Sequence, residues 1–548
     1  MSQQTAPATS SSAIQGAALS VDRIPFDQIP QFSQRDRAHV ARDPKLQPFI
    51  KYEVSLEDFA GVMNDKSSED TDRNLLVEVL REQYADTATE ATRSNIDDLL
   101  NDHTYTVTTA HQPSLFTGPL YYVYKIISTL NLADRLRAQY PEHRFVPIFI
   151  TGGEDHDFEE INHLNIFGKT IEWESGETGP VGRMSTKTLD EPLKQLRDIL
   201  GNSDHAAEIY KLIESTHRSA KTYGQAAVKL AQQLFGKYGL VVLNMDHPKL
   251  KARFAPYIER EIIGQTSAPL VEESIAGLEA AGFGAQASPR EINFFYLQPQ
   301  SRERIVFEED LYKVLNSELQ FTEAELRQEI QKHPERFSPN VVMRPIYQEL
   351  ILPNLAYIGG GGEIAYWMER KSQFEAFGIN FPMLIRRNSA LWVDKTSAKK
   401  LDKLGLTVTD LLADEEAVVK QWLRNNADEE LNLKAEKKEL QQLFERVTER
   451  MRSVDPTLGK AAKAEAVNQL KSLSQLESRL IRAEKQKHET AVGQIRSVRE
   501  KLFPGNGMQE RSDNFLQFYL QYGADYFEVL REAFDPLLGE LVVIRPEK

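Results

Sequence analysis

The sequence predicts an α/β protein: a doubly wound parallel sheet with insertions, followed by an antiparallel α-helical coiled coil. Two observations support this. In the first 395 residues, short apolar runs alternate with segments of helical periodicity, and each run ends at a polar or glycine-rich loop. Beyond residue 395 the chain becomes rich in Lys, Glu, Gln and Leu, with apolar residues at coiled-coil spacing. A chain of 548 residues is also too long for one core.

The elements of the predicted sheet follow in order along the chain. Two short amphipathic helices, 75–84 and 96–100, precede a β-branched strand at 105–110. A helix at 120–140 then leads to a buried strand at 144–150, which completes a strand–helix–strand unit. Further strands are expected at 239–244, 355–358 and 381–385. Because ligands bind at the carboxyl ends of such strands, the polar clusters that follow them are the candidate site.

We divide the chain into four parts. Two stretches of the core lack the strand–helix rhythm and are interpreted as insertions, the second containing a hairpin of 291–297 with 304–307. The last segment is aromatic, ends in a strand-like run at 541–544 and is expected to return to the core. The parts are a disordered tail at 1–22, a core at 23–395 with insertions at about 160–235 and 280–340, a coiled coil at 396–503 and a C-terminal segment at 504–548.

The coiled coil is predicted from two apolar series separated by a Pro/Gly break at 455–459. Glu484 and Lys487 fall at apolar-seam positions of the second helix. A local opening of the coil, a polar contact between the helices or a different register would each account for them. The first series is Leu433, Leu440, Phe444, Val447 and Met451, and the second is Ala466, Leu470, Leu473 and Leu480, resuming at Ala491, Ile495, Val498 and Leu502.

Composition excludes several classes of function. A formal net charge of −15 argues against a large surface for binding nucleic acid or an anionic membrane. The absence of cysteine excludes disulfides, thiolate zinc sites and a cysteine nucleophile, and we assign no metal ligands. No apolar stretch is long enough for a membrane span, and the N-terminus has no signal-peptide pattern, so the cytoplasm is the expected compartment.

The first candidate constellation is the loop from His111 to Lys125, between a strand and a helix. N–H groups at a helix start bind anions, His111 can donate a hydrogen bond or act as an acid or base, and Lys125 adds positive charge. An ordinary loop with a capping histidine is the alternative. Two prolines, a glycine and a histidine in one such loop favour a functional role. Its binding candidates are Gln112, Thr117, Gly118, Tyr121 and Lys125.

The second constellation is the acidic segment 151–160, which also follows a strand. Its acids could bind Mg²⁺, orient a substrate amine or serve as a general base. Acids that favour a helix N-terminus are the alternative, and this accounts for Glu159 and Glu160 better than for Asp155 and Asp157. The spacing matches no common metal motif. Gly153 and His156 are taken as binding residues and the two aspartates as catalytic.

The third and fourth constellations lie later in the core. Four glycines at 359–362 follow a strand, where close approach of the backbone to a ligand would justify their entropic cost. Glu363 and Tyr366 share one face of the helix after them. Arg386 and Arg387, at another strand end, suit a carboxylate or phosphate, although surface ion pairs explain them equally well. Glu363 is assigned a catalytic role; the remaining binding candidates are Asn244, Glu349, Asn354, Gly359, Gly360, Tyr366, Arg386 and Arg387.

Taken together, these segments resemble the BshC family, the cysteine-adding ligases of bacillithiol biosynthesis. The resemblance spans nearly the whole chain beyond the tail. The motifs that carry it are His111-Gln112-Pro113, Thr117-Gly118-Pro119-Leu120-Tyr121, Tyr124-Lys125, Gly153-Glu154-Asp155-His156-Asp157, Arg344-Pro345, Tyr347-Gln348-Glu349, Leu352-Pro353-Asn354, Tyr357-Ile358-Gly359-Gly360, Gly362-Glu363, Tyr366-Trp367, Phe503-Pro504-Gly505 and Gln509-Glu510-Arg511.

The resemblance implies a Rossmann-type core with connective-peptide insertions and a coiled coil that forms a homodimer. It implies that cysteine is joined through its carboxyl to the amine of glucosaminyl-malate. The core is similar to nucleotidyltransferases and class I aminoacyl-tRNA synthetases, with His111 in the place of the first histidine of their HIGH motif. Gln112 and Pro113 depart from that motif, so standard phosphate binding does not carry over. The related ligase of mycothiol synthesis holds zinc partly through cysteine. This chain has no cysteine, so it cannot hold zinc in that form.

Three hypotheses follow. The first is an amide-forming ligase in which the loop at His111 and Lys125 faces a nucleotide or an activated intermediate, Asp155 or Asp157 accepts the amine proton, and Arg386 or Arg387 holds the malate carboxylates. The second is a nucleotidyl- or glycosyl-type transferase on the same sheet. The third is a non-catalytic, nucleotide-binding dimeric scaffold. Cofactors are not assigned; ATP and Mg²⁺ remain open.

Overall fold

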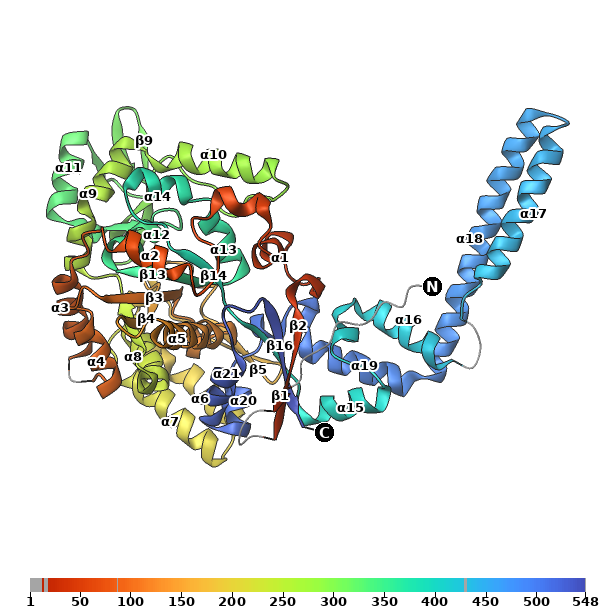
Figure 1. Cartoon of the computed structure of the whole chain (residues 1–548), viewed down its shortest axis with the longest axis horizontal. Coiled ribbons are helices and arrows are strands. Elements are labelled where there is room, and N and C mark those ends of the chain that lie inside the picture. Colours follow the sequence, from red (N-terminus) through yellow and green to blue (C-terminus); the bar gives the residue numbers. More distant parts are fainter. Residues whose placement is uncertain (1–11, 14–17, 86, 428–430, 548) are drawn as a thin grey trace. The chain divides into compact units, whose positions relative to one another are not determined.

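The computed structural model describes residues 12–13, 18–85, 87–427 and 431–547. The chain forms two compact units (Figure 1). The first combines residues up to Leu391 with the segment Gln509–Glu547, and the second spans Trp392–Met508. The predicted fold class is confirmed, since the first unit contains a parallel α/β sheet and the second contains an antiparallel helix pair.

A five-stranded parallel sheet forms the centre of the first unit, in the order β14-β13-β3-β4-β7. From β3 the chain steps outward to β4 and β7, then returns to the other side of β3 for β13 and β14. The strand order therefore reverses between β3 and β13, and a crevice at such a switch point is where open α/β sheets bind ligands. The strands are β3 (Thr104–His111), β4 (Arg144–Thr151), β7 (Val241–Asn244), β13 (Asn354–Gly359) and β14 (Met383–Arg386).

Crossover helices connect these strands. Helix α5 (Tyr121–Gln139) links β3 to β4 and packs on both strands. Helix α8 (Tyr223–Phe235) links β4 to β7 and packs on both, so the predicted insertion at about 160–235 includes an ordinary crossover helix at its end. Helices α13 (Gly361–Met368) and α14 (Lys371–Phe377) lie between β13 and β14.

Apolar side chains from both the helices and the strands form a core beside the sheet. Helix α2 (Phe59–Lys66) and α5 contribute to this core together with β3, β4, β13 and β14. Burial of this apolar area is the main favourable term for the unit. The cluster contains Phe59, Val62, Met63, Tyr105, Val107, Leu132, Ala133, Leu136, Phe145, Leu355, Ala356, Ile358, Met383 and Ile385.

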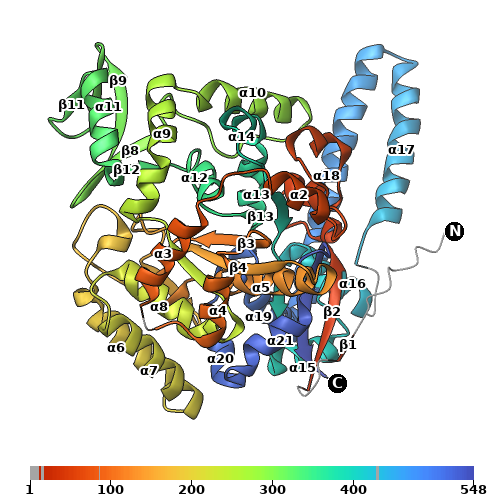
Figure 2. The same cartoon turned by 60° about the vertical axis from the view of Figure 1, so that its left-hand side comes forward.

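The two insertions fold as separate small structures (Figure 2). The first contains the hairpin β5 (His163–Ile166) and β6 (Lys169–Glu172), then α6 (Asp190–Leu200) and α7 (Asp204–Arg218). The second is an antiparallel sheet in the order β11-β10-β9-β8-β12. The predicted hairpin in this insertion is confirmed. Its strands are β8 (Phe294–Gln298), β9 (Ser301–Glu308), β10 (Leu311–Val314), β11 (Gln320–Phe321) and β12 (Phe337–Pro339), with α11 (Glu323–Lys332) between the last two.

The two ends of the chain pair with each other. Strand β2 (Leu19–Pro25) runs antiparallel to β16 (Glu540–Pro546) along the whole length of both. Of the predicted tail at 1–22, residues 1–11 and 14–17 lie outside the described residues. The prediction is wrong for its last residues, because residues 19–22 belong to β2. The short strand β1 (Ser12–Ala13) adds to the same sheet, and β15 (Ser389–Trp392) pairs on its other side.

The second unit is helical. Helices α17 (Lys434–Arg452) and α18 (Pro456–Lys487) form the predicted antiparallel pair. The predicted continuation of the second helix to Leu502 is wrong, because α18 ends at Lys487 and His488 has a non-helical backbone, with φ −107° and ψ 29°. Helix α19 (Glu489–Leu502) packs instead on α15 (Lys395–Leu404) and α16 (Glu415–Asn426).

The polar residues that interrupted the predicted seam therefore mark a helix end. His488 Nε2 lies 3.1 Å from the Glu484 carboxylate, and Lys487 Nζ lies 3.4 Å from the same carboxylate. None of the helices in the described part of the chain combines the length and the apolar character that crossing a bilayer requires.

A buried polar network underlies β13 and involves two of the predicted binding residues. Asn354 accepts hydrogen bonds from the hydroxyls of Thr106 and Thr108 and donates one to Glu349 Oε1 at 2.8 Å. Gln348 also donates to Oε1, whereas Oε2 has no hydrogen-bond partner among the described residues. Burial raises the pKa of Glu349 from 4.5 to about 7, although Lys66 and these hydrogen bonds oppose the rise. The network stabilises the sheet interior.

Replacement of Glu349 by Gln should therefore stabilise the core in a pH-dependent way. The folded-state pKa lies above the unfolded value, so the unfolded chain ionises first and the folded state loses relative stability as the pH rises from about 4.5 to about 7. Glu349→Gln keeps the acceptor oxygen and removes this loss. Its gain in melting temperature over the wild type should be larger at pH 8 than at pH 5. A gain that is equal at both values would contradict the assignment.

Candidate active site

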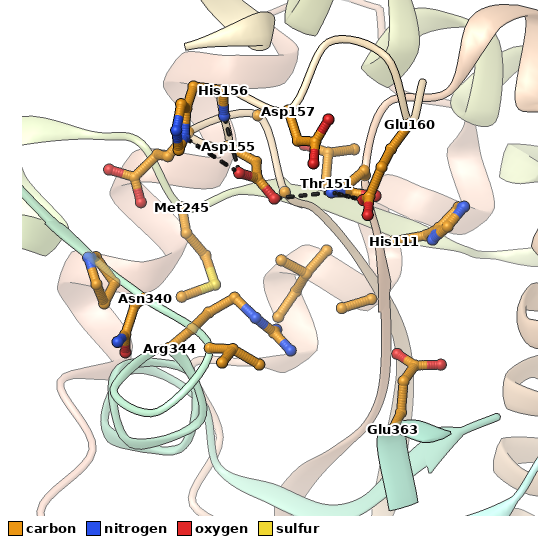
Figure 3. Close-up of a pocket in the computed structure, with 18 of the residues that line it drawn as sticks. His111, Thr151, Asp155, His156, Asp157, Glu160, Met245, Asn340, Arg344 and Glu363 are labelled. Atoms are coloured by element: carbon orange, nitrogen blue, oxygen red, sulfur yellow. Dashed lines mark hydrogen bonds and ion pairs between the residues drawn. The ribbon is translucent and has the colours of Figure 1, made fainter. Parts of the chain in front are cut away.

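A cavity of about 990 Å³ opens at the carboxyl ends of the central strands (Figure 3). It lies at the switch point, between the residues that follow β3 and β4 on one side and those that follow β13 on the other. The second insertion contributes Phe295 and Arg302, and the C-terminal segment contributes Arg511. The cavity is therefore built by the sheet, an insertion and the end of the chain together.

The structure brings most of the predicted site residues to this cavity. The predicted site residues that line the cavity are His111, Gln112, Tyr121, Lys125, Gly153, Asp155, His156, Asp157, Gly360, Glu363, Tyr366 and Arg387. Lining residues to which sequence reasoning gave no role include Glu154, Glu160, Met245, Asp246, Phe295, Arg302, Asn340, Arg344 and Arg511. Glu154, Arg344 and Arg511 belong to motifs that carry the resemblance, and Glu160 belongs to the acidic segment 151–160. Phe295 and Arg302, in contrast, lie on insertion strands whose sequence gives no signal of a site.

Opposite charges line opposite walls of the cavity. Asp155, Asp157 and Glu160 lie on one wall, and Arg344 and Glu363 lie on the facing wall (Figure 3). The cations Lys125 and Arg387 lie beside Glu363. A ligand with an amine at one end and a carboxylate at the other would be oriented by this division.

Hydrogen bonds from two directions hold the acidic wall in place. Gln112 Nε2 donates to Asp155 Oδ2 at 2.7 Å and to Glu160 Oε2 at 3.0 Å. Arg302, stacked 3.9 Å above the Phe295 ring, approaches Asp155 Oδ1 at 3.4 Å. Burial alone would raise the pKa of Asp155, but the contacts with His156, Arg302 and Gln112 outweigh it and lower that pKa well below 3.8. Asp155 is thus a permanent anion and a weak base.

Close backbone packing fixes the start of the acidic segment. A Cβ atom on Gly182 of the first insertion would lie 2.8 Å from the Cα of Gly153, and the Gly182 N–H donates to the Gly153 carbonyl at 2.8 Å. The contact therefore requires glycine at position 182, and a Cβ on Gly153 would lie only 3.3 Å from the Gly182 Cα. Beside it, Arg183 holds Asp246 in a bidentate pair with both N–O distances at 2.8 Å.

A buried ion pair joins the two sides of the switch point. Lys125 Nζ lies 2.6 Å from Glu363 Oε2 and donates to the Ala110 carbonyl at 2.8 Å. Glu363 also accepts from the Tyr357 hydroxyl at 2.7 Å and from the Gly360 N–H at 2.9 Å. Burial would raise the pKa of Glu363, but the charge of Lys125 and these hydrogen bonds lower it to about 2. With its oxygens occupied, Glu363 is a positioning residue.

His111 lies between this ion pair and the acidic wall. Its Nε2 is 3.3 Å from the Ser114 hydroxyl, and the rings of Tyr121 and Tyr122 pack edge-on against it at 5.1 and 5.7 Å. Burial, reinforced by the charge of Lys125, lowers the pKa of His111 from 6.5 to about 3. The imidazole is therefore neutral at physiological pH and can donate one hydrogen bond to a ligand.

The middle of the predicted anion-binding loop does not face the cavity. Gly118 has φ +62°, and a Cβ there would lie 2.6 Å from the Ser114 Cβ, so the turn itself requires glycine. Asn514 donates to the Gly118 carbonyl at 2.6 Å, and the Leu120 N–H donates to the Asp513 carbonyl at 2.8 Å. Thr117 is buried here as well. The loop binds the C-terminal segment through groups that the sequence suggested for a ligand.

Other predicted binding residues also lie outside the cavity lining. Arg386 pairs with the buried Asp36 at 2.8 Å and stacks near Phe26 and Phe32. Gly359 is a paired residue of β13, and the Asn244 side chain accepts from the Asp246 N–H at 3.1 Å. Glu349 and Asn354 belong to the network under β13. In the described part of the chain, no group of three His, Asp or Glu side chains could hold one metal ion.

Comparison with known proteins identifies the family. The model of the "Bacillithiol biosynthesis BshC, N-terminal Rossmann-like domain" matches residues 19–388, and that of the "Bacillithiol biosynthesis BshC, C-terminal coiled-coil domain" matches residues 390–546. The chain belongs to the BshC family. Its predicted resemblance to BshC proteins is thereby confirmed.

Relatives in the BshC family match along nearly the whole chain. A protein of Flavobacterium johnsoniae is 40% identical over 95% of this chain and 98% of its own length. A protein of Flavobacterium psychrophilum is 38% identical over 96% of this chain and its entire length, and one of Christiangramia forsetii is 39% identical over 95% and 98%. Each bears the name "Putative cysteine ligase BshC".

The pair of Lys125 and Glu363 can be tested by a double-mutant cycle. Either Lys125→Met or Glu363→Gln leaves a buried group without its partner and should cost about 3–5 kcal/mol of stability. The double variant should cost clearly less than the sum, because it leaves no unpaired charge. Unfolding in urea, followed by tryptophan fluorescence, measures this coupling. Additive losses would show that the two side chains do not act as a pair.

Proposed function

We propose that this chain is an amide-forming ligase that joins the carboxyl of cysteine to the amine of glucosaminyl-malate in the cytoplasm. The observation that carries the proposal is the pair of oppositely charged walls in one cavity at the switch point. Both substrates carry an amine and at least one carboxylate, so both can be oriented by such walls. Membership of the BshC family, with relatives named as cysteine ligases, supports the same reaction.

A carboxylate is a poor electrophile, so the reaction needs an activating co-substrate, for which we propose ATP. An oxygen of the cysteine carboxylate attacks the α-phosphorus and pyrophosphate leaves, which gives an acyl-adenylate. The acceptor amine then attacks the carbonyl carbon, the C–N bond forms, and AMP leaves with the carboxyl oxygen. The amine loses one proton in this step. An acyl-phosphate route would release ADP and phosphate instead, so the nucleotide product distinguishes the routes.

The geometry suggests a division of roles among the lining residues. Asp157 is exposed on the acidic wall and has no hydrogen bond or ion pair among the described residues, so it can accept the amine proton. The neutral His111 can donate to the oxygen that gains charge as the amine attacks. Arg344, which has no ion pair among the described residues, keeps the opposite wall positive, and this favours the anionic part of the substrates.

A direct assay tests this function. Purified protein with cysteine, glucosaminyl-malate and ATP should form bacillithiol, measured by mass spectrometry with the nucleotide products. His111→Ala should lower kcat by about 10²-fold. Asp157→Asn should lower kcat by about 10²–10⁴-fold with little change in KM. Because His111 is neutral, it should contribute no inflection near pH 6.5 to the pH profile of the wild type. The pH profile of the residual activity in His111→Ala should therefore have the same shape in this range.

Circular dichroism should show that both variants are folded. A folded wild-type protein without activity, or full activity in His111→Ala, would refute the scheme. Pyrophosphate release with an adduct that contains no cysteine would favour a nucleotidyl- or glycosyl-type transferase.

We further propose that the helical unit mediates a homodimer. Within the pair α17 and α18, Leu440, Phe444 and Leu470 on the predicted seam are only half-buried. Leu476 and Leu480, one turn apart on the same face of α18, are 50% and 37% exposed. A second copy would cover such apolar positions, as coiled-coil seams require. Light scattering should give twice the chain mass, and Leu476→Glu with Leu480→Glu should give a monomer. A monomeric wild type at micromolar concentration would contradict this.

A further inference from the structure

A cation from the C-terminal segment reaches the cavity. Arg511 lines the cavity and is exposed, and no carboxylate in the described ranges pairs with it. Arg511 lies far along the chain from every other lining residue, beyond the whole helical unit. A free guanidinium at the wall of a ligand cavity has the geometry to bind a planar anion.

Arg511 is held in place by buried contacts of its neighbours. Glu510, 1% exposed, accepts from Arg387 Nη2 at 2.7 Å, from the Ser389 hydroxyl at 3.0 Å and from the Ala390 N–H at 3.2 Å. On the other side, Asn514 is fully buried and binds the loop before α5. The backbone that carries Arg511 is thus fixed between two parts of the core, and only its side chain is free.

A second unpartnered donor lies nearby. Arg387 is 2% exposed and lines the cavity, yet its Nε–H has no hydrogen-bond partner in the described part of the chain. An ideal Cβ on Gly360 would lie 3.6 Å from this Nε, so glycine keeps the donor uncovered. A buried donor without a partner is costly, and a ligand that supplies an acceptor would remove the cost.

Both guanidinium groups lie beside the same side chain. Burial raises the pKa of Tyr121, and the positive charges of Arg511 and Arg387 oppose that rise. The Arg387 guanidinium lies 5.5 Å from the Tyr121 ring centre. Arg511 and the Nε of Arg387 therefore border one region of the cavity, beside Tyr121. The Arg387 Nε also lies near the start of α13, where the helix N-terminus favours negative charge.

We propose that Arg511 and the Nε–H of Arg387 form a subsite that binds a carboxylate of the malyl group of the acceptor, so that the C-terminal segment selects a dicarboxylate-bearing substrate. This assignment rests on the proposed function. A carboxylate fits better than a polyphosphate, because the facing wall is acidic and would repel the larger negative charge. In the nearby β3–α5 loop, the N–H groups of Leu115, Gly118 and Leu120 already donate to carbonyls of the protein.

Binding of L-malate alone, measured by calorimetry, tests the subsite without any turnover. Arg511→Gln should weaken malate binding roughly tenfold or more, as expected for the loss of a hydrogen bond to a charged group, and Arg511→Lys should restore part of it. Gly360→Ala should weaken it similarly by covering Arg387 Nε; its backbone, at φ −72°, accepts alanine. Arg93→Gln, the same charge change on an exposed residue of α4 (Glu90–Asp98), should bind like the wild type.

Three further ligands locate the effect. Arg511→Gln should lose affinity for glucosaminyl-malate but not for methyl glucosaminide, which has the sugar amine and no carboxylate, and its affinity for ATP should not change. Unchanged malate binding in Arg511→Gln, or a loss confined to ATP, would overturn the proposal. If malate binding depends on Arg511 while the wild type forms no bacillithiol, the subsite stands and the proposed reaction fails. If ligation occurs normally in Arg511→Gln, the reaction stands and the subsite fails.

Discussion

The buried pair of Lys125 and Glu363 is the interaction on which the site depends. Lys125 lies on the helix that follows the first strand of the sheet, and Glu363 lies on the helix that follows the fourth. These helices begin on either side of the switch point, beyond the paired strands β3 and β13. A contact of 2.6 Å between their side chains joins these two helices beside the cavity. The charge at the centre of the cavity is thereby neutralised, and the outer cations remain available to a ligand.

A second constraint comes from the way the walls are supported. The acidic wall follows β4, but its position depends on Gly182 of the first insertion and Arg302 of the second. The cationic wall depends on Glu510, which returns from beyond the helical unit to neutralise Arg387. The insertions and the C-terminal segment are therefore structural parts of the site. This explains why long stretches without the strand–helix rhythm are attached to an otherwise ordinary sheet.

Periodicity and strand-end position predicted the sheet and the place of the cavity from the sequence. They predicted individual roles less well, because a polar residue at a strand end can serve the fold as readily as a ligand. Arg386 pairs with Asp36, and Asn354 binds the hydroxyls of Thr106 and Thr108; both partners lie far away in the sequence. The break at His488 was signalled only by Glu484 and Lys487 on the seam, because Ala491, Ile495 and Val498 continue a helical spacing while packing on different helices.

The distribution of hydrogen bonds explains which predicted residues remain candidates for chemistry. Glu363 and Asp155 each have several donors, and their lowered pKa values make both poor proton acceptors. Asp157 has no such partner in the described ranges, and the imidazole of His111 is held neutral by burial. A residue whose hydrogen-bonding groups are already engaged can position a neighbour, whereas one with free groups can exchange a proton or bind a ligand. By this criterion Asp157 and His111 are the residues that we propose for the chemistry, and Arg387 and Arg511 are those that we propose for anchoring an anion.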